Sequence, residues 1–109
     1  MSAADLLEAW RAHLTMGRRR SPHTVRAYLS SATRLLQGTG IEDWPSLARI
    51  EGHALRNHLA ARRAEGIGNA SAARELSALK AFVTFARDQA GDPEARPPRL
   101  RGPRIRKGL

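Results

Sequence analysis

The chain has 109 residues, which suffices for one small domain with a modest core and leaves no room for a second. Its 19 lysines and arginines outnumber its 10 aspartates and glutamates, so the formal charge of +9 indicates a polyanionic partner, nucleic acid before an anionic membrane surface. The absence of cysteine excludes a disulfide framework and a cysteine-based metal site. No signal-peptide pattern or membrane-length apolar run is present, so we expect a cytoplasmic protein with no membrane partner.

Two amphipathic helices are predicted in the first part of the chain. One spans residues 2–16 and begins with Ser2 and Asp5, whose spacing is that of a capping box. The other spans residues 21–37, with Gly38 as its stop signal. The residues that face the core by helical periodicity are Leu6, Leu7, Trp10 and Leu14 in the first helix, and Val25, Tyr28, Leu29, Ala32, Leu35 and Leu36 in the second.

Two further helices follow a connector in which Trp44 is expected at the edge of the core. One spans residues 51–65, and the other runs from Asn69 or Ser71 to the residue before Gly91. Their predicted core residues are Ala54, Leu55, His58 and Leu59 in the third helix, and Ala72, Leu76, Leu79, Val83 and Ala86 in the fourth, with Phe82 and Phe85 to either side. Since no strand pattern is present, the sequence predicts an all-α, four-helix bundle.

Residues 92–109 differ in composition from the rest of the chain. Four prolines in this stretch each remove a backbone donor, so it cannot form a packed helix. It carries six basic and two acidic residues, a net +4, and residues 1–91 carry a net +5. We therefore expect a four-helix domain over residues 1–91 and a basic, proline-rich linker over residues 92–109, which leads toward a domain absent from this chain.

Three consecutive arginines, Arg18, Arg19 and Arg20, directly precede the second helix. Ser21 suits the N-cap and Pro22 suits the first helical position. A helix N-terminus carries partial positive charge and unpaired N–H donors, so it repels guanidinium groups. A bound anion removes this conflict, and we interpret the cluster as a phosphate-binding site. The alternative is a solvated run of charge.

No pattern of residues is typical of a catalytic or metal site. His53 and His58 are five apart on one helix, so their side chains point in well-separated directions and do not have metal-ligand spacing. We interpret His58 as a partly buried core residue and His53 as a solvated one. The acidic residues are scattered without the paired arrangement typical of acid–base catalysis, and no glycine-rich phosphate loop is present. The sequence therefore predicts a chain without catalytic activity, cofactor or metal.

The outer faces of the second and fourth helices suit contact with DNA. At 100° per residue, the residues turned away from the core are His23, Arg26, Ala27, Ser30 and Arg34 in the second helix, and Arg74, Ser77, Ala81 and Thr84 in the fourth, with Lys80 at its flank. Small residues between an arginine and two hydroxyls let a helix approach a groove closely, since bulky side chains would hold its backbone away. An ordinary solvated helix face is the alternative interpretation.

Five segments carry a family resemblance: GRRRSPHTVRAYLSSATRLL, WPSL, LRNHLAARRAEG, NASAARELSALKAFVTFA and RPPRLRGPRIRKGL. Their most specific parts are S-x-x-T-x-x-x-Y at Ser21, Thr24 and Tyr28, and the run from Ala73 to Phe82. In this order they resemble the N-terminal core-binding domain of tyrosine recombinases, the phage-integrase family, and most of all its XerC/XerD members. The resemblance covers nearly the whole chain.

The resemblance implies a SAM-like bundle of four helices that clamps one side of a recombination half-site. In that family the second and fourth helices lie against double-stranded DNA, the first helix contacts neighbouring protomers, and a larger C-terminal domain carries the catalytic residues. The candidate DNA-binding residues are Arg18, Arg19, Arg20, Ser21, His23, Thr24, Arg26, Arg74, Ser77 and Lys80, with Arg101, Arg104, Arg106 and Lys107 in the linker. We expect the non-catalytic, DNA-binding part of a nucleoid-associated recombinase, acting in DNA integration or chromosome dimer resolution.

Two other functions fit the same residues. A helical protein-interaction module would bind through the first helix around Trp10, and its basic charge would serve solubility or an acidic partner. An RNA-associated basic bundle would bind structured RNA as well as it binds duplex DNA.

Overall fold

The computed structural model describes residues 1–91, and all of the regular structure in that part is helical. The elements are α1 (Ala3–Ala12), η1 (His13–Gly17), α2 (Pro22–Thr39), α3 (Trp44–Ala48), α4 (Gly52–Ala64) and α5 (Asn69–Ala90). The predicted linker contacts lie outside the described residues: Arg101, Arg104, Arg106 and Lys107. The all-α prediction is confirmed, and the four long helices correspond to the four that the periodicity predicts.

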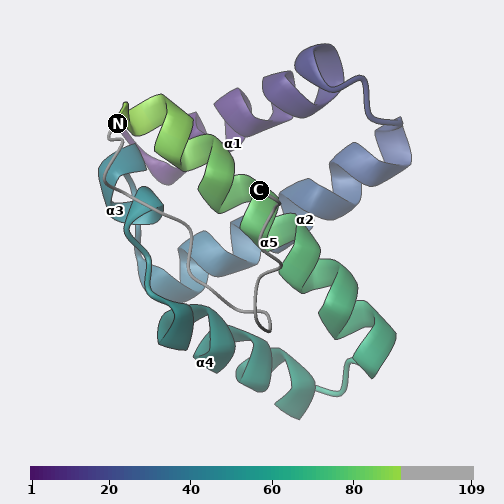
Figure 1. Ribbon diagram of the computed structural model, residues 1–109. Helices are drawn as coiled ribbons and strands as arrows, with labels where there is room; N and C mark the ends of the chain where they lie inside the picture. Colours follow the sequence, from purple (N-terminus) through teal and green to yellow (C-terminus); the bar gives the residue numbers. More distant parts are fainter. Residues whose placement is uncertain (92–109) are drawn as a thin grey trace, which may run out of the picture.

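The last helix, α5, is the element against which most others pack. It contacts α2, α3 and α4, while α1 and the π-helical turn η1 pack against α2. Figure 1 shows α5 crossing α2 and running antiparallel to α4, to which a short loop joins it. The largest fully buried side chains are Trp10, Phe82, Leu6, Leu14, Leu35, Leu47, Leu55, Leu79 and Val83. Within residues 1–91, no helix has both the length and the apolar character needed to cross a membrane.

Aromatic rings join α1 and α3 to the second half of α5. The Trp10 ring lies with its centroid 5.2 Å from that of Phe82 and 5.1 Å from that of Phe85. The Trp44 ring meets Phe85 edge-on, with centroids 5.3 Å apart. Both phenylalanines are therefore central to the core and not beside it. Because Trp10 is only 2% exposed, it cannot be the centre of an exposed binding face on the first helix.

The predicted N-terminal caps of the first two helices are present. The backbone N–H of Ser2 donates to Asp5 Oδ2 at 2.9 Å, and the Asp5 N–H donates to Ser2 Oγ at 3.4 Å. At the start of α2, Ser21 Oγ accepts from the backbone N–H of Thr24 at 3.2 Å. Each hydroxyl thus satisfies a backbone donor that the helix leaves without an internal partner.

The predicted stop of the second helix at Gly38 is wrong by two residues. The helix continues through Thr39, and Gly40 takes the left-handed conformation with φ of 74°. The Gly40 N–H donates to the carbonyl of Leu36 at 2.8 Å, which closes the last turn. A residue without Cβ adopts this conformation readily, so Gly40 and not Gly38 ends the helix.

The predicted connector contains a short helix of its own, α3. Asp43 caps it, since Asp43 Oδ1 accepts from the backbone N–H of Ser46 at 2.8 Å, and this hydrogen bond lowers the pKa of the Asp43 carboxyl. Trp44, Leu47 and Ala48 are buried against the rest of the core. Five residues are too few to show a helical period, so the sequence pattern predicts only the tryptophan as a core contact.

Candidate nucleic-acid interface

A groove of about 590 Å³ lies between the first halves of α2 and α5 and reaches α4. In Figure 1 these two half-helices diverge from the point where α5 crosses α2. The lining residues are His23, Thr24, Ala27, Tyr28, Ser30, Ser31 and Arg34 of α2, Ser71, Arg74, Glu75, Ser77 and Ala78 of α5, Arg62 of α4, and Arg20 and Ile67 from the adjoining loops. The outer face predicted for the second helix lines this groove except for Arg26. The fourth predicted helix contributes Arg74 and Ser77 to it, whereas Ala81 and Thr84 line a separate hollow.

The structure brings five of the ten described candidate residues together in this groove. They are Arg20, His23, Thr24, Arg74 and Ser77.

The other five candidates lie elsewhere. Ser21 caps α2, and Arg26 lies on a neighbouring side of that helix, beside Leu29 and Thr33. Lys80 is half-buried and does not line the groove, and Arg19 is exposed. Arg18 lines a separate hollow. Contact with DNA stays a prediction for all ten.

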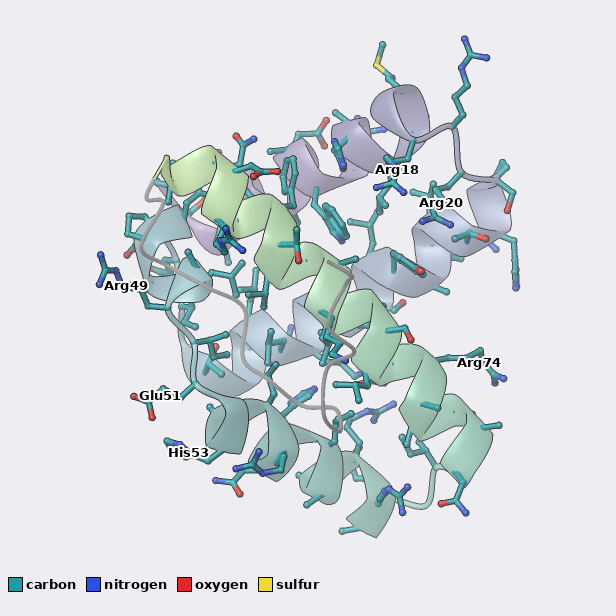
Figure 2. All side chains as sticks on the ribbon, viewed as in Figure 1. Arg18, Arg20, Arg49, Glu51, His53 and Arg74 are labelled. Carbon is teal, nitrogen blue, oxygen red and sulfur yellow. The ribbon has the colours of Figure 1, made fainter. Side chains whose placement is uncertain are left out.

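The arginine cluster before α2 divides between two surfaces. Arg20 lies over the ring of Tyr28, with its guanidinium carbon 5.6 Å from the ring centroid, a cation–π contact at the rim of the groove. Arg18 and Arg20 also line a hollow of about 240 Å³ beside Thr84 and Asp88 of α5. Figure 2 shows both arginine side chains at this end of the molecule. The three arginines therefore do not form a single site, because only Arg20 lines the groove.

Arg74 marks the opposite rim of the groove, on α5. Its Nη2 atom donates to Ser71 Oγ at 3.3 Å, one turn earlier on the same helix. The residue is exposed, and Figure 2 shows its side chain pointing away from the body of the molecule. A guanidinium on a solvent-facing rim can reach a large ligand without displacing any packed side chain.

The floor of the groove holds a buried carboxylate that the sequence analysis missed. Glu75 is 6% exposed, and its oxygens accept from Arg34 Nη2 at 3.0 Å and from Arg62 Nε at 3.2 Å and 3.3 Å. His58 Nε2 lies 3.2 Å from Glu75 Oε2. The prediction that His58 is partly buried is confirmed, whereas Arg34 is only partly turned outward because Glu75 holds it.

A sequence signal for this cluster exists. Glu75 stands three residues after Ala72 and four before Leu79, which places it on the buried face of α5. A carboxylate on a buried face requires cationic or hydrogen-bonding partners, because an unpaired buried charge is strongly unfavourable. The charge alone predicts that partners exist; which arginines they are depends on how α2 and α4 pack.

The groove carries a net positive charge. Its lining contains four arginines and one glutamate, so the formal charge is +3 with histidine neutral. Low-dielectric walls and a single sign of charge concentrate the field in a cleft and attract anions. Hydroxyls and small side chains lie between the charges, as the helical wheel predicts.

His53 does not line the groove. His53 Nδ1 is 3.1 Å from Glu51 Oε1 at the exposed start of α4, which agrees with its interpretation as a solvated residue. Figure 2 shows both side chains on the side of the molecule opposite to Arg74. Within the described part of the chain, no group of three or more histidine, aspartate or glutamate residues lies close enough together to hold a metal ion.

Comparison with known proteins gives relatives of one kind. A "Tyrosine recombinase XerC" from Methylobacterium sp. (strain 4-46) is 44% identical over 89 residues, which are 74% of this chain and 28% of that protein. Proteins with the same name from Nitrobacter winogradskyi and Mycobacterium leprae are 35% and 37% identical over 82 and 95 residues. These alignments cover 70% and 84% of this chain, and 25% and 31% of the two relatives.

The chain therefore spans roughly a quarter of the length of the curated relatives it matches. No solved structure matches it. A family model does match: residues 7–90 fit that of the phage integrase N-terminal SAM-like domain. This match covers α2, α4 and α5 completely and α1 from residue 7 onward. The all-α fold, the family model and the XerC relatives all point to the same family. The chain belongs to the phage integrase N-terminal SAM-like domain family.

Proposed function

We propose that this chain is the DNA-binding, non-catalytic part of a site-specific tyrosine recombinase. Residues 1–91 serve as a core-binding domain that clamps one side of a recombination half-site, and residues 92–109 serve as a basic linker that adds phosphate contacts. The recombinase acts in DNA integration or recombination, specifically in chromosome dimer resolution, and works at the nucleoid in the cytoplasm. In the full-length protein, the exposed side of α1 meets neighbouring protomers.

The observation that carries this proposal is the groove between α2 and α5. Its rims carry Arg20 and Arg74, and its walls carry hydroxyls, including those of Thr24 and Ser77. Arginine forks and hydroxyls are the groups that most often bind DNA phosphates, and a helix with small outward residues can enter a major groove. The two half-helices diverge, so duplex DNA can lie against both at once.

A fluorescence-anisotropy titration tests the proposal. The 109-residue chain is titrated, at low and moderate salt, against a short duplex carrying the host's chromosome-dimer-resolution half-site, its scrambled counterpart and a structured RNA. Neutralising about four to six phosphates gives a slope of log affinity against log salt of roughly −4 to −5. We expect this slope on both duplexes, with tighter binding to the half-site.

Three substitutions locate the contact in the same assay. We expect Arg20→Ala to weaken all duplexes alike, as loss of a phosphate contact does. We expect Arg74→Ala to cost about 1–3 kcal/mol and to relax sequence preference, as loss of a base contact does. Arg11→Ala is the matched control, because it removes an exposed arginine of α1, away from the groove.

Each of the other outcomes contradicts a stated part of the proposal. If the chain bound no duplex at low salt, the result would favour a protein-interaction module that binds through the exposed side of α1. Equal binding of structured RNA and duplex DNA would favour an RNA-associated bundle. Unchanged affinity and preference in Arg74→Ala would show that α5 is not the helix that reads the sequence.

A further inference from the structure

Glu75 is the only charged residue among residues 1–91 that is buried, and it lies at the floor of the positively charged groove. It belongs to α5, whereas its two guanidinium partners belong to α2 and α4. The carboxylate therefore ties three helices together at one point. Two of these helices form the walls of the groove.

Glu75 does not occupy all the N–H donors of the two arginines. The side chain of Arg34 is 36% exposed and lines the groove, and its buried Nε atom has no hydrogen-bond partner. Arg62 is shared, since its Nη1 atom pairs with the exposed Glu65 at 2.6 Å while its Nε atom faces Glu75. Both guanidinium groups thus line the groove, and each directs only some of its N–H donors to Glu75.

We propose that Glu75 is a positioning residue that sets both the charge and the shape of the groove, so that it lowers general affinity for DNA and raises sequence preference. This inference rests on the proposed function, because it concerns the same groove. One carboxylate offsets one of the positive charges that would otherwise meet phosphates. By holding Arg34 of α2 and Arg62 of α4 in place, Glu75 also fixes the positions of these two helices relative to α5, whose first half lines the groove.

The two effects have separate signatures in DNA binding. Removing the charge of Glu75 frees about one additional cation for a phosphate, so the salt slope steepens by about 0.9. Loosening the walls weakens the discrimination between sequences, since base contacts depend on position while phosphate contacts do not. A residue with only a structural role would lower all binding and would not steepen the slope.

The test compares Glu75→Gln with Glu8→Gln in the 109-residue chain. Both substitutions remove one negative charge that pairs with an arginine, but Glu8 is exposed on α1 and does not line the groove. We expect Glu75→Gln to steepen the slope on the scrambled duplex by about 0.9, to tighten its binding at low salt, and to reduce the preference for the half-site about fivefold. We expect Glu8→Gln to match the unsubstituted chain.

A second variant keeps the proposal testable if Glu75→Gln does not fold. Arg34→Gln leaves Glu75 paired with Arg62 and His58, so we expect a slope shallower by about 0.9 together with a reduced preference. A steeper salt slope in Glu75→Gln and a shallower one in Arg34→Gln, with a reduced preference for the half-site in both, would identify Glu75 as the residue that sets the groove's charge and shape.

The outcomes separate this inference from the proposed function. A folded Glu75→Gln that behaves as Glu8→Gln does, in a chain that binds duplex DNA, would overturn the inference alone. If only Arg34→Gln folds, an unchanged slope and preference in that variant would overturn it. Failure of the unsubstituted chain to bind duplex DNA at low salt would overturn both.

Discussion

At the scale of single residues, Glu75 shows how a buried charge is held within a basic domain. Burial by itself raises the pKa of its carboxyl, because solvent no longer stabilises the charge. Hydrogen bonds and charges from Arg34 and Arg62 outweigh burial, so the pKa lies below its ordinary value. The carboxylate is therefore ionised at neutral pH and stabilises the folded chain there.

This lowered pKa predicts how stability depends on pH. The carboxylate contributes stability above its ordinary pKa, near 4.3, and loses it as the pH falls through the lower folded value. We expect Glu75→Gln to reduce the free energy of unfolding by about 1–3 kcal/mol at pH 7, since two guanidinium groups lose their partner, and by less at pH 3. Urea unfolding of both chains at pH 7, 5 and 3 measures the difference.

The exposed Glu8 is the control for this measurement. Hydrogen bonding to Arg11 also lowers its pKa, but the pair is solvated, and such pairs contribute little to stability. We expect Glu8→Gln to leave the free energy of unfolding nearly unchanged at every pH. A loss in Glu75→Gln that stays the same from pH 7 to pH 3 would show that the charge of Glu75 does not stabilise the fold.

At the scale of elements, the sequence predicts what depends on local periodicity and capping. The four long helices, the capping box at Ser2 and the N-cap at Ser21 are all confirmed. The sequence does not predict the short helix α3, because its five residues are too few to show a helical period. The Glu75 cluster was missed for a similar reason: its partners come from helices distant in sequence, and no local pattern pairs them.

The end of α2 offers a direct test of the corrected helix boundary. Gly38 lies inside the helix, and a Cβ there would come no closer than 3.7 Å to His58 Nδ1, an ordinary contact. We expect Gly38→Ala to stabilise the chain by about 0.5–1 kcal/mol, because alanine loses less backbone entropy in a helix. We expect Gly40→Ala to destabilise it by about 1–2 kcal/mol, because φ is 74° there.

Thermal or urea unfolding of the two variants measures these effects. They differ by two positions and add the same methyl group, so each serves as the control for the other. If Gly40→Ala stabilised the chain and Gly38→Ala destabilised it, the helix would end at Gly38, as the sequence predicts.

At the scale of the whole molecule, positive charge is distributed over both parts of the chain. Residues 1–91 carry a net +5 and residues 92–109 a net +4. Among the described residues, the hydrophobic cluster has members from all the helices. We therefore expect that residues 1–91 fold without residues 92–109.

Truncation after Gly91 tests this separation. We expect residues 1–91 to keep the same helical signal and unfolding midpoint as the 109-residue chain, because they retain the hydrophobic cluster described above. We expect a shallower salt slope on duplex DNA, by about 0.9 for each phosphate contact that the linker supplies. Circular dichroism and anisotropy measure the two properties.

A 109-residue chain with Arg101, Arg104, Arg106 and Lys107 changed to glutamine controls for tail length. It should bind as the truncated chain does, if charge is what the linker contributes. Loss of the fold on truncation would contradict the division at Gly91, and an unchanged slope would contradict the predicted linker contacts.

The two tryptophans have a spectroscopic consequence. Trp10 and Trp44 reach the core from α1 and α3, and both meet Phe85 of α5. Neither lines the groove between α2 and α5. Their shared burial makes the intrinsic fluorescence of the protein a reporter of α5 docking: the emission lies to the blue in the native state and shifts red as both indoles meet water. The chain thus carries its own optical probe of folding, built from residues that are not part of the groove lining.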